Sequence, residues 1–121
     1  KNFLIVDAAM NDLIRPAFYE AYHEIVPVRR KPGARISADV VGPICESGDF
    51  FCQDRPLPKS EQGDCLALMS AGAYGSVMGF NYNTRRLPAE IMVKGNRAAL
   101  VRARQPVKAI WNGEKPAPWQ R

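Results

Sequence analysis

Proline and glycine interrupt this sequence so often that little room is left for long helices. Its 121 residues include ten prolines and nine glycines, and both residue types end or bend regular structure. The apolar runs between them are short and contain Val, Ile, Phe and Tyr, which favour strands. We therefore expect a mainly β fold, a β-sandwich or a Greek-key β-barrel, with short helices inserted between its strands.

The apolar runs also indicate where the elements lie. Strands are predicted over residues 3–6, 24–30, 36–45 and 64–71, with a charged turn at 29–33 and a hairpin over 89–104 around Lys94-Gly95-Asn96. Short helices are predicted over residues 16–23 and 106–111, since proline suits the first turn of a helix. Residues 46–63 are expected to be mostly loop, because Pro56 and Pro58 disfavour a strand.

The length allows one domain, residues 1–121. Hydrophobic residues make up 46% of the chain and charged residues 24%, as is typical of a globular protein. No apolar run approaches the ~18 residues that a membrane-spanning helix needs, so we expect no membrane partner. The sequence opens on Lys1, and a strand of buried type follows at once. We expect the chain to be part of a longer protein.

Positive charge is concentrated in the last third of the chain. Residues 1–84 carry 8 basic and 10 acidic side chains, a net −2, whereas residues 85–121 carry 9 basic and 2 acidic ones, a net +7. Such a segment is either a solvated face or a site for an anionic partner. Aromatic residues would be interleaved on a nucleic-acid surface, but Arg97, Arg102 and Arg104 are separated by aliphatic ones. We expect no nucleic-acid partner; a basic β-barrel that binds nucleic acid is the alternative.

Three cysteines, Cys45, Cys52 and Cys65, and one histidine, His23, limit the metal and redox chemistry. An odd number of cysteines without a signal peptide argues against a secreted disulfide framework and favours a reducing, cytoplasmic compartment. The chain has no Cys-x-x-Cys pair. His23, which we expect at the surface or at a helix end, is poorly placed to complete a zinc site. No metal site is predicted.

The segment Cys45-Glu46-Ser47-Gly48-Asp49 is unusual, because a thiol, a hydroxyl and two carboxylates follow an apolar strand. A thiol with a pKa near ~8.5 can donate a proton at neutral pH or, beside a base, act as a nucleophile. The alternative is a buried, inert cysteine beside two solvated acids. For Cys52 and Cys65, which lack such a neighbourhood, the inert alternative is favoured.

Two further groups are candidates for ligand binding. In the run Ala71-Gly72-Ala73-Tyr74-Gly75, small residues permit close approach to a ligand, and Tyr74 adds a ring and a hydroxyl; the alternative is a close-packed strand end. Arg15 and Tyr19 would share a helix face, and arginine binds carboxylates and phosphates through two parallel hydrogen bonds. The alternative is an exposed Arg15 and a packed Tyr19.

Four segments are similar to signatures of one family. They are residues 3–19, which end in Arg15-Pro16-Ala17-Phe18-Tyr19; residues 40–49, which end in Cys45-Glu46-Ser47-Gly48-Asp49; Ser70-Ala71-Gly72-Ala73-Tyr74-Gly75; and Asn81-Tyr82-Asn83 with Arg86 and Pro88. In order and spacing they resemble the C-terminal domain of the diaminopimelate decarboxylases over nearly the whole chain. Ala9, where that family usually has glycine, is a departure. The alternative within the group is an ornithine or arginine decarboxylase, which shares the thiol but not the Cys-Glu-Ser-Gly-Asp run.

The resemblance implies a cofactor and a reaction. The family uses pyridoxal 5′-phosphate to convert meso-2,6-diaminopimelate to L-lysine and carbon dioxide, the last step of lysine biosynthesis. Its members are homodimers with the active site at the subunit interface. An N-terminal (β/α)₈ barrel supplies the lysine that holds the cofactor, and no lysine of this chain matches that motif. The resemblance therefore implies that residues 1–121 are the C-terminal β domain and are inactive alone.

The resemblance also implies roles for single residues. Cys45 would enter the active site of the partner subunit and return a proton to the α-carbon after carbon dioxide leaves. Glu46 would contact the distal amino group of the substrate. Arg15 and Tyr19 would hold its distal carboxylate, which ornithine lacks. Tyr74 would contact the substrate and the cofactor, the latter at its phosphate.

Overall fold

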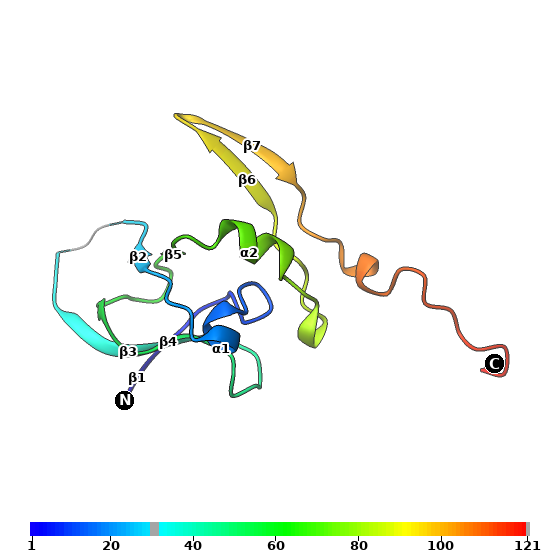
Figure 1. Ribbon diagram of the computed structural model, residues 1–121, viewed down its shortest axis with the longest axis horizontal. Coiled ribbons are helices and arrows are strands. Elements are labelled where there is room, and N and C mark those ends of the chain that lie inside the picture. Colours follow the sequence, from blue (N-terminus) through cyan, green and yellow to red (C-terminus); the bar gives the residue numbers. More distant parts are fainter. Residues whose placement is uncertain (30–31, 121) are drawn as a thin grey trace. The chain divides into compact units, whose positions relative to one another are not determined.

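The computed structural model describes residues 1–29 and 32–120 and shows a mainly β chain with short helices, as predicted (Figure 1). Its strands are β1 (Asn2–Ile5), β2 (Ile25–Pro27), β3 (Arg35–Val41), β4 (Phe50–Pro58), β5 (Leu66–Leu68), β6 (Glu90–Lys94) and β7 (Arg97–Arg102). Its helices are α1 (Arg15–Tyr19) and α2 (Gly72–Val77), and its 3-10 turns are η1 (Tyr82–Thr84) and η2 (Val107–Trp111). The chain divides into two compact units, Lys1–Gly79 and Phe80–Arg121.

The first unit is built around a three-stranded sheet in the order β1-β3-β4. β1 pairs with β3 in parallel, and β4 pairs with β3 antiparallel. β2 and β5 form a separate antiparallel pair. The core joins both sheets to the segment before α1, and its buried members are Leu13, Ile25, Val40, Phe51, Cys52 and Leu57.

The predicted fold class is confirmed in its β content and its short helices only. The strands of the described residues form three small sheets, and these do not close into a barrel. The parallel pairing of β1 with β3 also departs from a Greek key, in which neighbouring strands are antiparallel. Within residues 1–29 and 32–120, no helix is long and apolar enough to cross a membrane.

Strand β4 corrects the prediction that residues 46–63 are mostly loop. Pro56 and Pro58 lie opposite Ser37 and Arg35 of β3. Because the two prolines are two residues apart, both missing N–H groups point to the same side of the strand. β4 is an edge strand, and proline is tolerated where that side has no partner strand. The prediction was wrong because an edge position is visible only once the sheet is known.

Four smaller differences concern the ends of elements and one side chain. The small-residue run at 71–75 forms the start of α2 and is not a strand end, and β5 covers only three residues of the predicted strand 64–71. The predicted strand 24–30 is confirmed over β2, but Arg30 and Lys31, within the predicted charged turn, lie outside the described residues. His23, predicted at the surface or at a helix end, is neither: it is only 1% exposed, lies beyond the end of α1 at Tyr19, and has its Nδ1 3.0 Å from the carbonyl oxygen of Met69.

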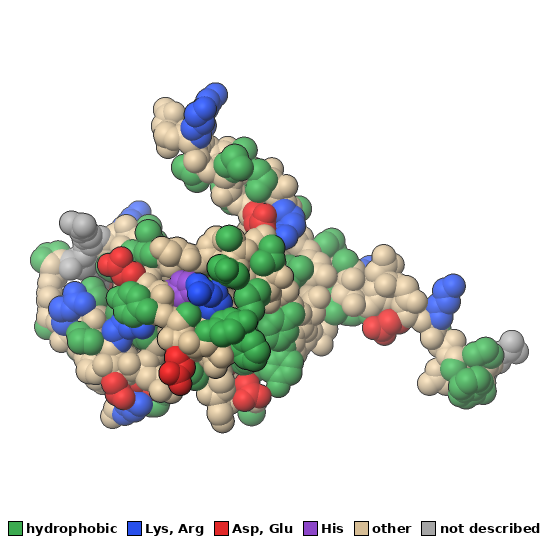
Figure 2. All heavy atoms as spheres, in the orientation of Figure 1, with side chains coloured by type: hydrophobic (Ala, Val, Ile, Leu, Met, Phe, Trp, Pro, Cys, Tyr) green, Lys and Arg blue, Asp and Glu red, His purple; other side chains and the backbone are tan. Residues whose placement is uncertain are grey.

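The second unit contains the predicted hairpin of β6 and β7. Gly95 in its turn has a φ of +60°, a conformation that glycine adopts without strain. The opposed pairs Ile91–Leu100 and Val93–Ala98 lie on one face. Figure 2 shows hydrophobic side chains on the hairpin surface, where Ile91, Val93 and Leu100 are each more than half exposed. Turn η2 confirms the short helix predicted at residues 106–111.

The buried carboxylate of Asp39, in strand β3, makes the stability of the first unit depend on pH. Asp39 accepts hydrogen bonds from Lys1 Nζ (2.9 Å) and from the amide of Asp54 (2.7 Å). Burial alone would raise the pKa of Asp39, but these contacts outweigh it and leave that pKa below its ordinary value of 3.8. Because Asp39 has a lower pKa in the folded chain than in the unfolded chain, its ionised form stabilises the fold at any pH above the unfolded value. This stabilisation is lost as the pH falls through the pKa of Asp39 in the folded chain.

We therefore expect Asp39→Asn to reduce the loss of unfolding free energy that wild type shows as the pH is lowered. Urea unfolding of both chains between about pH 5 and pH 2 measures this effect. Wild type should lose stability more steeply than the variant once the pH falls below 3.8. Parallel profiles in that range would show that Asp39 does not carry the effect.

Candidate functional site

Cys45 and Glu46 lie in the connection between β3 and β4, residues 42–49, because the strand predicted to reach residue 45 ends at Val41. Both side chains are exposed, so the alternative is wrong in expecting a buried Cys45, and its reactivity stays a prediction. The connection is closed by backbone hydrogen bonds, from the Gly42 amide to the Asp49 carbonyl and from the Asp49 amide to the Glu46 carbonyl, both 3.0 Å long. An accessible thiol on an ordered connection of this kind can meet a ligand.

The buried side chain of Asp49 fixes this connection to a distant part of the chain. Its Oδ1 accepts a hydrogen bond from the Met10 amide and its Oδ2 one from the Ile44 amide, each 2.7 Å long. A Cβ at Gly42 would lie 2.4 Å from Asp49 Oδ2, so only glycine permits this approach. The sequence patterns indicated no separate role for Asp49. The sequence feature that could have indicated one is a carboxylate at the end of a loop that begins with glycine.

Helix α1 carries Arg15 and Tyr19. Pro16 lies in its first turn, as predicted, but the helix ends at Tyr19 and not at residue 23, since Glu20 turns to a left-handed φ of +54°. The Arg15 guanidinium lies 4.6 Å from the centroid of the Tyr74 ring, a cation–π contact. Tyr19 is 57% exposed, so the alternative of an exposed Arg15 with a packed Tyr19 is wrong.

Helix α2, which carries Tyr74, packs on the segment that precedes α1. A Cβ at Gly75 would lie 3.7 Å from the Asp12 carbonyl oxygen and 3.9 Å from Leu13 Cδ1. Leu13 belongs to the buried core. This packing explains how Tyr74, far from Arg15 in the sequence, comes to lie under its guanidinium.

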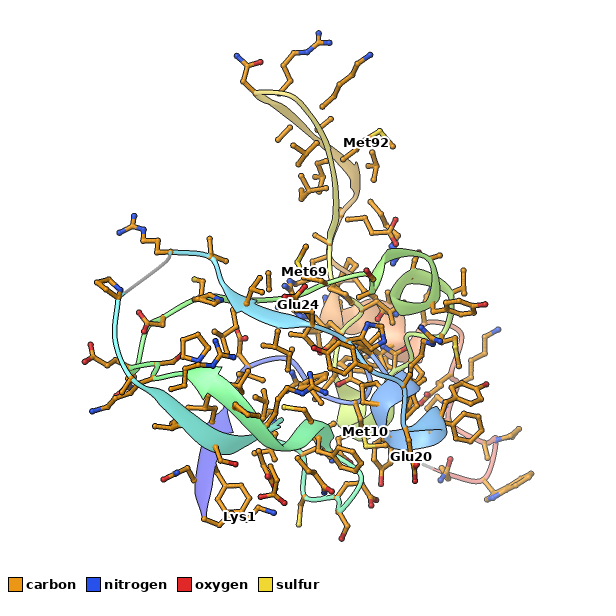
Figure 3. All side chains as sticks on the ribbon, turned by 60° about the vertical axis from the view of Figure 1, so that its left-hand side comes forward. Lys1, Met10, Glu20, Glu24, Met69 and Met92 are labelled. Atoms are coloured by element: carbon orange, nitrogen blue, oxygen red, sulfur yellow. The ribbon has the colours of Figure 1, made fainter. Side chains whose placement is uncertain are left out.

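Three of the predicted motifs therefore meet at one segment, residues 9–14. The 42–49 connection reaches it through the Asp49 contact with Met10, which Figure 3 shows beside α1. Helix α2 reaches the same segment through Gly75. In the part of the chain that the structure describes, the side chains of Arg15 and Tyr74 are in direct contact, whereas no side-chain hydrogen bond or ring contact joins Cys45 or Tyr19 to that pair.

The other cysteines offer less chemistry. Burial in the core raises the pKa of the Cys52 thiol, which disfavours the reactive thiolate. Cys65 is exposed and not in a disulfide. No sequence motif around it indicates a function. Across residues 1–29 and 32–120, no three His, Cys, Asp or Glu side chains gather as metal ligands would.

Known proteins are similar to this chain in sequence and in fold. The family model described as pyridoxal-dependent decarboxylase, C-terminal sheet domain, matches residues 1–72, which include Arg15, Tyr19, Cys45 and Glu46. The chain belongs to the pyridoxal-dependent decarboxylase family. Among curated relatives in that family, a diaminopimelate decarboxylase from Vibrio cholerae is 52% identical over 118 residues, which are 98% of this chain and 28% of the relative.

Solved decarboxylase structures have the same fold. A diaminopimelate decarboxylase from M. jannaschii superimposes with a TM-score of 0.89 at 38% identity, over 96% of this chain and 26% of its own. The Helicobacter pylori enzyme complexed with L-lysine gives 0.82 at 41% identity, over 90% of this chain and 27% of its own. The similarity to the C-terminal sheet domain of diaminopimelate decarboxylase is thus confirmed, and the chain spans 28% of the length of the Vibrio cholerae relative.

Proposed function

We propose that this chain is the C-terminal domain of a homodimeric, cytoplasmic decarboxylase that uses pyridoxal 5′-phosphate to convert meso-diaminopimelate to L-lysine and carbon dioxide. The named relatives support the substrate, and one of the solved relatives is complexed with L-lysine. The observation that carries the proposal is the exposed Cys45–Glu46 connection, which Asp49 holds to the segment leading into Arg15. A thiol proton donor, a carboxylate and a guanidinium suit a substrate with two amino and two carboxylate groups.

Each residue has a separate role in this proposal. Pyridoxal phosphate, when bound, supplies the electron sink that lets carbon dioxide leave. Cys45 then donates a proton to the α-carbon, in the active site of the partner subunit, because a thiol proton is available near neutral pH. Glu46 pairs with the distal ammonium group. Arg15, assisted by Tyr19, binds the distal carboxylate through parallel N–H donors.

Tyr74 fits a phosphorylated cofactor. Its side chain is 53% exposed, and a phenolic hydroxyl donates well to a phosphate oxygen. The ring of Tyr74 has a second role, because it supports the Arg15 guanidinium. Tyr74 would thus hold the cofactor phosphate and orient the substrate-binding arginine, while its own contact with the substrate stays a prediction.

A fusion enzyme tests the proposal. The 121 residues replace the matching part of the Vibrio cholerae relative, and release of carbon dioxide is measured with meso-diaminopimelate, L-ornithine and L-arginine. We expect release from meso-diaminopimelate alone. Preference for ornithine or arginine would favour the related decarboxylases. A folded fusion that binds the cofactor but releases nothing from any of the three would overturn the proposal.

The 121-residue chain alone is expected to be inactive with added cofactor. Decarboxylation of this type needs an imine-forming lysine and a site around the cofactor phosphate, and in this family both belong to the barrel. A carbon dioxide assay with meso-diaminopimelate and pyridoxal phosphate measures the effect. Release above the level given by the cofactor without protein would contradict the expectation.

A further inference from the structure

The side chain of Asp49 belongs to the most specific motif of the chain, yet it does not face a ligand. It is 4% exposed, and each of its carboxylate oxygens already accepts a backbone hydrogen bond, from Met10 and from Ile44. A carboxylate that is buried in this way is closed to a substrate. Its contacts lie instead within the scaffold that carries the proposed site.

The two amides that Asp49 binds come from the two halves of that site. Ile44 directly precedes Cys45 in the 42–49 connection. Met10 is 39 residues from Asp49 in the sequence and lies in the segment that leads into Arg15. The same segment packs beside the connection, since a Cβ at Gly48 would lie 3.5 Å from Met10 Cε and 3.8 Å from Ala17 Cβ. One buried carboxylate therefore ties the thiol-bearing connection to the arginine-bearing helix.

We propose that Asp49 is the positioning residue that holds Cys45, by fixing its connection to the segment that leads into α1. The role rests on the proposed function, because it matters for catalysis only if Cys45 donates the proton. Charge-assisted hydrogen bonds to backbone amides are short and directional, so they hold the connection more firmly than its exposed side chains would. A displacement of about 1 Å at a reacting group can lower a rate by about 100-fold.

Gly42 provides an independent way to disturb the same anchor. Its backbone amide bonds to the Asp49 carbonyl, and any Cβ there would overlap the Asp49 carboxylate at 2.4 Å. Gly42→Ala should therefore displace the carboxylate without changing its chemistry. Asp49→Asn does the reverse, since it keeps the shape but replaces one acceptor oxygen with an NH₂ group that cannot accept from an amide.

Amide hydrogen exchange in the fusion enzyme measures the anchor itself. We expect Asp49→Asn and Gly42→Ala to speed exchange at Met10 or Ile44 at least about tenfold, with core amides such as that of Val40 unchanged. The matched control is Asp64→Asn, because Asp64 also accepts a backbone hydrogen bond, from Glu61, but lies outside the connection. Unchanged exchange at both amides in both variants would overturn the proposal, and so would uniform acceleration across the unit, since that would indicate a general loss of stability.

Steady-state kinetics of the fusion measure the consequence for catalysis. Both variants should lower kcat by about 10- to 100-fold and leave KM for meso-diaminopimelate within about threefold, with Asp64→Asn close to wild type. If the unmodified fusion is active and both variants keep their kcat, the role of Asp49 is wrong while the proposed function stands. If the unmodified fusion is inactive, the proposed function fails, and this role fails with it, whatever the exchange data show about the anchor.

Discussion

Replacing Cys45 by alanine in the fusion enzyme is expected to lower kcat about 10²- to 10⁴-fold, the usual contribution of a general acid or base. The KM for meso-diaminopimelate should change little, because a proton donor acts in the chemical step and adds little to ground-state affinity. The exposed position of Cys45 makes this role accessible. Initial rates of carbon dioxide release over a range of substrate concentrations give both constants.

Cys65 supplies the matched control for this experiment. It is also a free, exposed cysteine, but it follows no motif of the family, so Cys65→Ala should retain wild-type turnover. Cys45→Ser should stay strongly impaired, since a serine hydroxyl is a far weaker acid than a thiol. Wild-type turnover in Cys45→Ala would show that Cys45 is a surface thiol without a role in the reaction.

The second large effect is expected at Arg15. In the fusion, Arg15→Ala should lower the preference for meso-diaminopimelate over a lysine-like analogue without the distal carboxylate by about 10- to 100-fold. A charge-assisted hydrogen bond to a carboxylate contributes roughly 1.5–3 kcal/mol, and about 1.4 kcal/mol corresponds to a factor of ten. The ratio of kcat/KM for the two substrates measures the preference.

Three further variants sharpen the assignment of Arg15. Tyr19→Phe should reduce the preference less, because it removes only a neutral hydroxyl. Arg15→Lys should recover only part of it, since an ammonium lacks the planar pair of donors. Arg29→Ala, at an exposed arginine of the same unit, should leave the preference unchanged. A preference in Arg15→Ala within about twofold of wild type would show that Arg15 does not bind the distal carboxylate.

Local sequence patterns were sufficient for several elements. The hairpin of β6 and β7 and the strand β1 lie within one or two residues of their predicted positions, because turn residues and apolar runs act over short distances. The motifs were likewise sufficient to indicate the family, and the match to its C-terminal sheet domain confirms it. The roles that the motifs imply for Cys45, Glu46, Arg15, Tyr19 and Tyr74 remain predictions.

The features that the sequence did not reveal depend on long-range packing. Pro56 and Pro58 are compatible with a strand only because β4 lies at a sheet edge. The contact of Arg15 with Tyr74 requires α2 to pack beside residues 9–14. The role of Asp49 likewise depends on an amide 39 residues away. No local pattern encodes such partners, so they become visible only in the folded chain.

Mixing two inactive fusions tests most directly whether this chain completes a decarboxylase site in the partner subunit. One fusion carries Cys45→Ala, and the other carries a substitution of the cofactor-binding lysine in its N-terminal part. If Cys45 serves the site of the partner, each mixed dimer contains one intact site and one doubly defective site. After dissociation and reassembly, equal amounts should give roughly a quarter of the wild-type rate of carbon dioxide release. A mixture that reassembles into dimers but is no more active than its separate components would contradict the claim.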